Sequence, residues 1–262
     1  MEAEQKRNAL KTYFGYDTFR PGQEEIIDQI LSGRDVLAVM PTGAGKSICY
    51  QLPALLLPGT AIVVSPLISL MMDQVKALNE AGVHAAYINS SLSERQTARA
   101  LELAKEGRYK LIYVAPERLE TRRFLDFACH AQISMITVDE AHCISQWGQD
   151  FRPSYVRIRS FVRQLPLRPV VSAFTATATE KVRQDILASL ELEPNLYFEV
   201  QRARDKKERV RRYLAEHSRE SGIIYCATRK AVDELYLWLE DAGFSVGRYH
   251  AGMSADARRR SQ

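Results

Sequence analysis

The sequence has few of the features that mark secreted, disulfide-bonded or membrane-bound proteins. Its 262 residues include only four cysteines, which are scattered without a C-x-x-C pair, so neither a disulfide framework nor a zinc site is predicted. No apolar run reaches the roughly twenty residues of a membrane-spanning helix. Residues 1–7 lack the apolar core of a signal peptide. These absences predict a cytoplasmic protein with reduced thiols and no membrane partner.

Neither positive nor negative residues are in large excess. The formal net charge of +4 excludes no class of partner, although seven basic residues crowd the stretch 202–212. That cluster fits a solvated helix face as well as a nucleic-acid contact. Apolar residues are abundant, at 46%, which suffices for the core of one large domain or two modest ones.

Residues 35–47 have the order of a nucleotide-phosphate cradle: an apolar strand, a glycine loop and the start of a helix. The glycines would let backbone N–H groups approach a triphosphate, while Lys46 adds a mobile positive charge and Ser47 can ligate magnesium. Met40 occupies the first glycine position of the usual motif, and the stretch alone does not separate a kinase from a motor. The predicted phosphate-binding residues are Thr42, Gly43, Ala44, Gly45, Lys46 and Ser47.

Apolar runs alternate with helical stretches through the first 190 residues. The predicted strands are 36–39, 61–64, 85–88, 111–114, 133–138 and 170–174. The predicted helices are one that ends near 14–15, one that begins after 21–22, and 46–56, 67–81, 93–106, 154–164 and 179–190. Strands without polar alternation, separated by helices, predict an α/β fold with a parallel sheet covered on both faces. The loops that follow the strands are then expected to meet at one edge.

One of these strand ends carries two adjacent carboxylates, Asp139 and Glu140. In a phosphate-loop NTPase, Asp139 would hold magnesium through water, and Glu140 would orient and polarise the attacking water. Lys46, Asp139 and Glu140 are therefore the predicted catalytic residues, with Ser47 and Asp139 as magnesium ligands. His142 has no second histidine at a ligand spacing, so a hydrogen-bonding role near the nucleotide is favoured over metal binding.

After Leu190 the alternation of strands and helices begins again. Pro194 interrupts the pattern and predicts a boundary between a first domain, 1–193, and a second, 194–262. The second domain lacks a phosphate loop and has too few strands for a complete sheet, so it is expected to be incomplete. Its predicted elements are a strand at 196–200, a charged helix from 206, a strand at 222–226, a helix from 228 and a strand at 245–249.

Six segments, in this order, resemble the motifs of RecQ-family DNA helicases. They are 19–23 (FRPGQ), 40–47 (MPTGAGKS), 65–71 (SPLISLM), 115–118 (APER), 139–148 (DEAHCISQWG) and 173–178 (AFTATA). The continuation 147–153 is the most specific, because DEAD-box RNA helicases share the phosphate loop without carrying it. The resemblance covers nearly the whole chain and implies a RecA-like first domain followed by an incomplete second RecA-like domain.

The resemblance implies ATP and Mg²⁺ as cofactors. Tyr16 would stack on adenine while Arg20 and Gln23 hold its edge, an arrangement that suits a purine. Without the resemblance, Tyr16 would be interpreted as a core or capping aromatic residue.

The resemblance also implies residues that couple DNA to hydrolysis. Residues 142–153, here named the aromatic loop, resemble a DNA-sensing loop in which aromatic faces stack on bases of any sequence. Taken alone, Trp147 and Phe151 would be interpreted as core, and Thr175 and Thr177 as a strand end that caps a helix. Backbone-contacting loops are implied in the second domain. The residues assigned to DNA binding or coupling are Arg118, His142, Trp147, Phe151, Arg152, Thr175, Thr177, Thr228, Arg229 and His250.

The sequence is thus predicted to be the core of a RecQ-like enzyme that hydrolyses ATP, moves 3′ to 5′ on single-stranded DNA and separates duplexes in recombination and repair. Single-stranded DNA and 3′-tailed duplexes are the predicted partners, and the nucleoid is the expected location in a bacterium. Relative to the family, a short segment before Pro194 and the final helicase motifs are missing. The alternative is therefore an ATP-gated DNA-binding or annealing module without turnover. A small-molecule kinase leaves the aromatic loop unexplained.

Overall fold

The computed structural model describes residues 3–147, 150–192, 205–216, 224, 226, 228–250 and 252–253. The chain divides into two units, Met1–Tyr197 and Phe198–Gln262. The predicted domain boundary, between 193 and 194, lies outside the described residues. Of the helices that the structure describes, none is long and apolar enough to cross a lipid bilayer.

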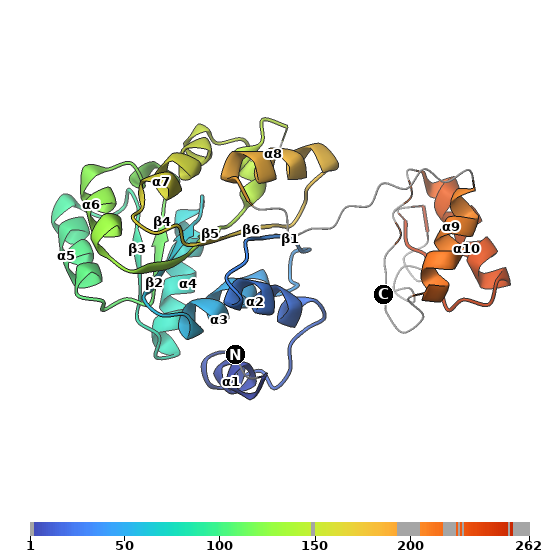
Figure 1. Ribbon diagram of the computed structural model, residues 1–262, viewed down its shortest axis with the longest axis horizontal. Coiled ribbons are helices and arrows are strands. Elements are labelled where there is room, and N and C mark those ends of the chain that lie inside the picture. Colours follow the sequence, from blue (N-terminus) through green and yellow to red (C-terminus); the bar gives the residue numbers. More distant parts are fainter. Residues whose placement is uncertain are drawn as a thin grey trace. The chain divides into compact units, whose positions relative to one another are not determined.

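The first unit is built on a six-stranded sheet (Figure 1). Its strands are β1 Val36–Val39, β2 Thr60–Val64, β3 Ala85–Ile88, β4 Leu111–Val114, β5 Ile133–Val138 and β6 Val170–Thr175. They lie in the order β1-β6-β5-β2-β4-β3, and every neighbouring pair is parallel. The predicted α/β fold is confirmed, and each predicted strand is correct to within one residue at either end.

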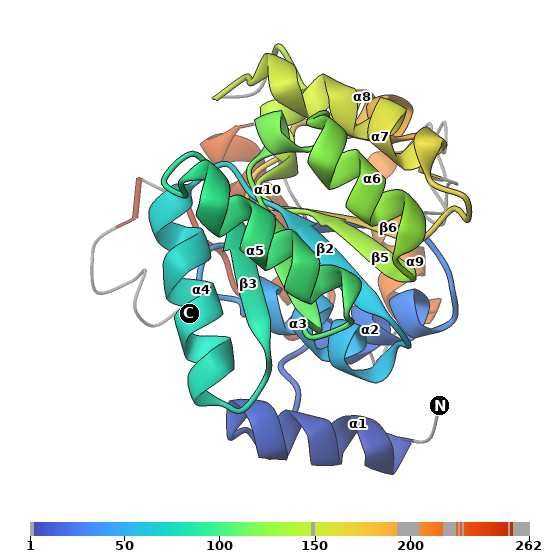
Figure 2. The same ribbon diagram turned by 90° about the vertical axis from the view of Figure 1, so that its left-hand side faces the viewer.

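Helices cover both faces of this sheet. They are α2 Gln23–Leu31, α3 Lys46–Leu56, α4 Ile68–Glu80, α5 Glu94–Lys105, α6 Arg122–His130, α7 Ile158–Gln164 and α8 Glu180–Leu190. Helix α1 Ala3–Ala9 packs against α3 in a separate small cluster. The shorter helical turns are Leu10–Phe14, Pro116–Arg118, Ala141–Ile144 and Pro153–Arg157. Figure 2 shows α5 and α6 packed side by side across one face.

The two faces form two separate hydrophobic cores because successive residues of a strand point to opposite sides. Along β2, Ile62 and Val64 enter the core beneath α5–α8, whereas Ala61 and Val63 enter the core beneath α2–α4. Both faces are covered by helices, which explains why the strands are largely apolar. Helix α6 was not predicted, although Phe124, Phe127 and Ala128 give it an apolar face.

The carboxyl ends of the strands meet at one edge because all the strands are parallel. Backbone hydrogen bonds continue the sheet past these ends, from Met40 N to Thr175 O at 2.9 Å and from Asp139 N to Val64 O at 2.9 Å. The phosphate loop and the Asp139–Glu140 pair therefore lie at the same edge, as predicted. Ser65 joins them, since its N–H donates to Val114 O at 3.1 Å.

The described part of the second unit contains two helices, α9 Lys206–Glu216 and α10 Arg229–Asp241, and both were predicted. The predicted strand at 196–200 lies outside the described residues, as does most of the one at 222–226. The predicted strand at 245–249 is wrong, because these residues are described and form no strand. An apolar segment becomes a strand only when its backbone pairs with a neighbour, and no described residue pairs with 245–249.

Candidate functional site at the carboxyl edge of the sheet

The loop between β1 and α3 has the backbone shape that its glycines predict. Gly43 and Gly45 have φ values of 84° and 81°, a left-handed region that favours glycine. A Cβ atom on Gly45 would also lie only 2.5 Å from Gln23 Nε2. The loop leads directly into α3 at Lys46, where the first backbone N–H groups of a helix can bind an anion. This geometry suits phosphate oxygens.

Gln23 and Arg20 brace the phosphate loop. The buried Gln23 amide donates to Ala44 O at 3.3 Å and to Gly45 O at 3.1 Å, and its oxygen accepts from Arg20 N at 2.8 Å. The Arg20 guanidinium donates to Gly43 O. Tyr16 is half-exposed, so its ring is accessible. The adenine contacts assigned to Tyr16, Arg20 and Gln23 stay a prediction, whereas the bracing of the loop was not foreseen.

A chain of polar groups joins the phosphate loop to the ends of β5 and β6. Lys46 Nζ lies 3.6 Å from Glu140 Oε1, and Glu140 Oε2 lies 3.3 Å from His142 Nδ1. The same ring nitrogen lies 2.9 Å from Thr175 Oγ1. Because the Thr175 hydroxyl donates to Thr177 O at 3.1 Å, His142 Nδ1 is the donor to Thr175. The structure therefore brings five of the predicted site residues into one network.

Asp139 is buried beside this network. Burial, reinforced by the charge of Glu140, raises the pKa of the Asp139 carboxyl to about 6, while Lys46 and the Glu140 N–H oppose the shift. Asp139 Oδ1 accepts from Glu140 N at 3.0 Å. Glu140 itself has a left-handed φ of 47°, which is uncommon outside glycine and typical of functional sites. A cation next to Asp139 would favour its ionised form.

The donor set fits magnesium that arrives with a nucleotide. Ser47, on the first turn of α3, and Asp139 offer hard oxygen atoms, which Mg²⁺ prefers together with phosphate oxygens and water. Among the described residues there is no group of three or more His, Cys, Asp or Glu side chains that could hold a metal ion by itself. In a complex with the nucleotide, phosphate oxygens and water would complete the coordination.

The two aromatic side chains of the aromatic loop lie outside the hydrophobic core. Trp147 is 67% exposed and Phe151 is 36% exposed, so the core interpretation of these residues is wrong. Lys181 Nζ, on α8, lies 3.4 Å from the centroid of the Trp147 ring. Arg152 donates to Asp150 Oδ2 at 3.0 Å and to Pro66 O at 3.1 Å. Lys181 was missed by sequence reasoning, because nothing local relates it to the loop.

Arg118 lies in the turn after β4 and lines a hollow of about 410 Å³. Its Nε atom is buried, and no described residue accepts a hydrogen bond from it. Arg122 and Arg123, at the start of α6, line the same hollow and were also missed. Three arginines next to the carboxyl edge make this hollow suited to an anion such as a phosphate.

The second-unit residues gather near the start of α10. Thr228 caps this helix, accepting from Ala231 N at 3.1 Å. His250 Nε2 lies 3.1 Å from Asp233 Oδ1, and His250 Nδ1 accepts from Gly252 N at 3.2 Å. Arg229, the first residue of α10, is exposed. Their assignment to DNA stays a prediction.

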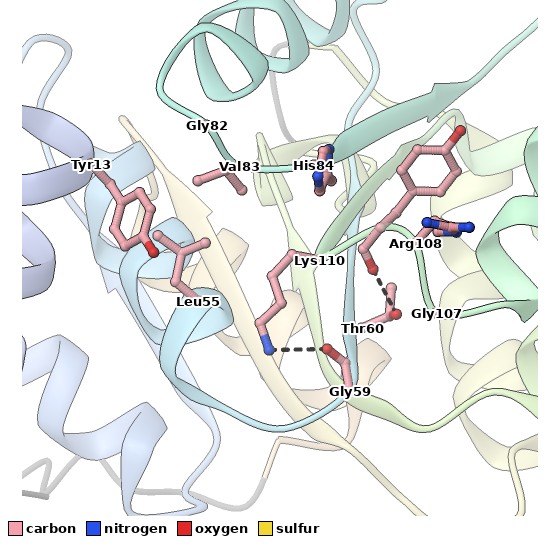
Figure 3. Close-up of a pocket in the computed structure, with 11 residues that line it drawn as sticks. Tyr13, Leu55, Gly59, Thr60, Gly82, Val83, His84, Gly107, Arg108 and Lys110 are labelled. Carbon is pink, nitrogen blue, oxygen red and sulfur yellow. Dashed lines mark hydrogen bonds between the residues drawn. The ribbon is translucent and has the colours of Figure 1, made fainter.

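A second hollow, of about 440 Å³, lies at the starts of β2, β3 and β4, and thus at the edge opposite the phosphate loop (Figure 3). Lys110 donates to the carbonyl of Gly59, which lines the hollow, at 3.2 Å and also to the carbonyl of Leu57. Thr60 Oγ1 donates to Tyr109 O at 2.9 Å. Burial lowers the pKa of Lys110. The ammonium group of Lys110 is thus hydrogen-bonded to main-chain carbonyls.

Known proteins resemble this chain over most of its length. A family model described as DEAD/DEAH box helicase matches residues 20–186. The chain is 46% identical to the ATP-dependent DNA helicase RecQ of Bacillus subtilis (strain 168), over 98% of this chain and 45% of that protein. It is 41% identical to the ATP-dependent DNA helicase RecQ of Haemophilus influenzae, over 97% of this chain and 43% of that protein. The chain therefore spans less than half the length of these relatives.

Solved structures share the fold. A hypothetical ATP-dependent RNA helicase from Sulfolobus tokodaii superposes with a TM-score of 0.59 at 18% identity, covering 99% of this chain and 78% of that one. The Hef helicase domain of Pyrococcus furiosus gives a TM-score of 0.52 at 21% identity, over 67% of this chain and 36% of that one. At such identities the likeness establishes the α/β architecture alone.

Proposed function

The chain belongs to the DEAD/DEAH box helicase family, and from this premise we propose that it works as an ATP-dependent DNA helicase of the RecQ type. In this proposal, hydrolysis drives 3′ to 5′ movement on single-stranded DNA and separates 3′-tailed duplexes during recombination and repair in the cytoplasm. The polarity and the pathway rest on the resemblance to RecQ helicases. The 46% identity to a bacterial RecQ supports the DNA substrate.

The polar network of Lys46, Glu140, His142 and Thr175 is the observation that carries the proposal. Loop N–H groups and Lys46 would bind the β- and γ-phosphates. Mg²⁺, held by Ser47 and Asp139, would neutralise charge that develops on the phosphates. Once Lys46 turns to a phosphate, Glu140 Oε1 becomes available to orient the attacking water, with His142 beside Oε2.

The aromatic loop supports coupling to DNA because it begins within this network. His142 contacts both Glu140 and Thr175, and Trp147 follows on the same loop with an exposed ring. A base that stacks on Trp147 can therefore shift the loop that positions Glu140. Stacking depends on a flat face and not on base identity, which suits a motor that must move along any sequence.

The test is ATP hydrolysis by the chain with and without single-stranded DNA, followed by unwinding of 3′-tailed and 5′-tailed duplexes. The proposal expects Mg²⁺-dependent turnover that DNA stimulates, a preference for the 3′ tail, and loss of turnover in Glu140→Gln with ATP binding retained. A rate of ATP hydrolysis that is the same with and without single-stranded DNA would contradict the proposal. Binding of ATP and DNA without any turnover would instead support an ATP-gated DNA-binding or annealing module.

A further inference from the structure

Helix α8 holds Trp147 through both its backbone and its ring. Lys181 Nζ lies 3.4 Å from the ring centroid, within the range of a cation–π interaction. The Trp147 N–H donates to Ser145 Oγ at 3.1 Å, and this hydroxyl donates to Asp185 Oδ2 at 2.5 Å. Lys181 and Asp185 are four residues apart, so they project from the same side of α8. One face of a core-packed helix thus fixes the exposed tryptophan.

The contact with Lys181 leaves most of the indole accessible. The ammonium lies over the ring, yet Trp147 is still 67% exposed. A stacking base needs only one flat face. An ammonium over the opposite face does not compete for that surface. It also restrains the Trp147 side chain before DNA binds, so that less conformational freedom is lost on binding. The arrangement is that of a preorganised stacking platform.

We propose that Lys181 is a positioning residue for single-stranded DNA, which holds the Trp147 indole with one face open to an incoming base. The inference rests on the proposed function, because it assigns Lys181 a role in the DNA contact of the aromatic loop. The positive charge of Lys181 also lies beside the platform, where it would attract the phosphate next to a stacked base. Asp185 contributes by fixing the loop backbone through Ser145.

Trp147 fluorescence tests this role without requiring hydrolysis. The sequence has two tryptophans, so Trp238 is replaced by Phe in every protein, and the full chain is titrated with oligothymidylate. The variants are Lys181→Met, which removes the charge, and Lys181→Arg, which keeps a cation over the ring. Lys76→Met is the matched control, because Lys76 is an exposed lysine on α4 that pairs only weakly with Glu80 at 3.9 Å.

Lys181→Met is expected to raise the DNA concentration at half-saturation by about threefold to tenfold and to make free Trp147 more accessible to acrylamide. Lys181→Arg is expected to stay within about twofold of the parent, because guanidinium also stacks on indole. A shift in Lys76→Met equal to that in Lys181→Met would overturn the proposal, because charge alone would explain it.

Two further outcomes separate this inference from the proposed function. Unchanged or tighter DNA binding by Lys181→Met, with a clear response in the parent, would overturn the role of Lys181 and leave DNA binding by the aromatic loop standing. Tighter binding would mean that Lys181 competes with the base for the Trp147 ring. A parent whose Trp147 fluorescence does not respond to DNA would overturn both.

Discussion

The two edges of the parallel sheet each hold a partly buried lysine, but the two lysines have different partners. Lys46, at the carboxyl edge, forms an ion pair with Glu140 at 3.6 Å. Lys110, at the opposite edge, donates to the main-chain carbonyls of Leu57 and Gly59. A carboxylate side chain can be exchanged for a phosphate, whereas the carbonyls are part of the fold. Lys46 is therefore suited to a ligand, and Lys110 to holding β4 against the start of β2.

A hollow that contains a charged side chain is not by itself a binding site. The hollow near Lys110 lies at the edge where strands begin, and its lysine is already bonded to the backbone. The edge near Lys46 collects the loops that follow β1, β5 and β6, where a doubly covered parallel sheet binds ligands. Substitution of each lysine should therefore affect a different property of the protein.

The largest expected effect is that of Lys46→Ala on ATP turnover. Removal of the charge that meets the phosphates should lower DNA-stimulated hydrolysis by a factor of about 10² to 10³, because one preorganised donor is typically worth that much. The free energy of unfolding should change little, since Lys46 belongs to none of the hydrophobic clusters. Steady-state ATPase rates and urea unfolding curves measure the two effects. Hydrolysis at the parent rate would remove the phosphate loop from the mechanism.

The next largest effect is expected at the buried Asp139, and it depends on pH. The pKa of Asp139 is raised to about 6 in the folded protein, so this group favours folding at low pH and loses that contribution as pH rises through 6. Asp139→Asn removes the buried charge. It should therefore raise the free energy of unfolding at pH 8 by up to about 3 kcal/mol, with the gain vanishing toward pH 4.

The same substitution should cost function. Magnesium needs the ionised carboxylate, so Mg²⁺-dependent ATP binding by the parent should weaken below pH 6, and Asp139→Asn should bind Mg²⁺·ATP poorly at any pH. Urea unfolding and nucleotide titrations at several pH values provide the measurements. A variant whose stability gain stays constant from pH 4 to pH 8 would show that Asp139 is not the group that titrates.

Lys110→Met sharpens the contrast at the other edge. Loss of the charged hydrogen bonds to Leu57 O and Gly59 O should lower the free energy of unfolding by about 2 kcal/mol, while the apolar stem is retained. DNA-stimulated turnover, measured well below the melting temperature, should match the parent, because Lys110 lies at the opposite edge of the sheet. If Lys110→Met lost turnover and kept its stability, Lys110 would serve catalysis and not the stability of the fold.

The sheet and the phosphate loop could be predicted from the sequence because their signals are local. A strand buried on both faces is largely apolar, so β1–β6 stand out, and a loop with left-handed backbone favours glycine. Helix α6 was missed because it has only nine residues and its first residues, Arg122 and Arg123, are charged. The strand predicted at 245–249 is wrong because pairing, and not composition, makes a strand.

The contacts around the site could not be predicted, because they join residues that are far apart in sequence. Gln23 braces Gly45 only after α2 has packed beside α3, and Lys181 covers Trp147 only after α8 has packed against the turn Ala141–Ile144. The left-handed φ of Glu140 was likewise unforeseen, since glutamate has no preference for it. Site residue types are thus readable from the sequence, whereas their partners are not.

The smallest effects come from two buried threonines, one at each edge of the sheet. Thr60 Oγ1 donates to Tyr109 O at 2.9 Å, and Thr175 Oγ1 donates to Thr177 O at 3.1 Å. Replacement of either residue by valine keeps the branched shape and deletes one hydroxyl. Each variant should lose about 1 kcal/mol of unfolding free energy, the usual net value of a buried hydrogen bond.

The two threonine variants should differ in their rates of DNA-stimulated ATP hydrolysis. Thr175 also accepts from His142 Nδ1 at 2.9 Å, so Thr175→Val frees the imidazole that lies 3.3 Å from Glu140 Oε2 and should lower DNA-stimulated hydrolysis by about threefold to tenfold. Thr60→Val removes a hydroxyl from the edge without the network and should hydrolyse ATP at the parent rate. Equal turnover in the two variants would mean that the Thr175 hydroxyl serves stability alone, and that Glu140 is positioned without help from β6.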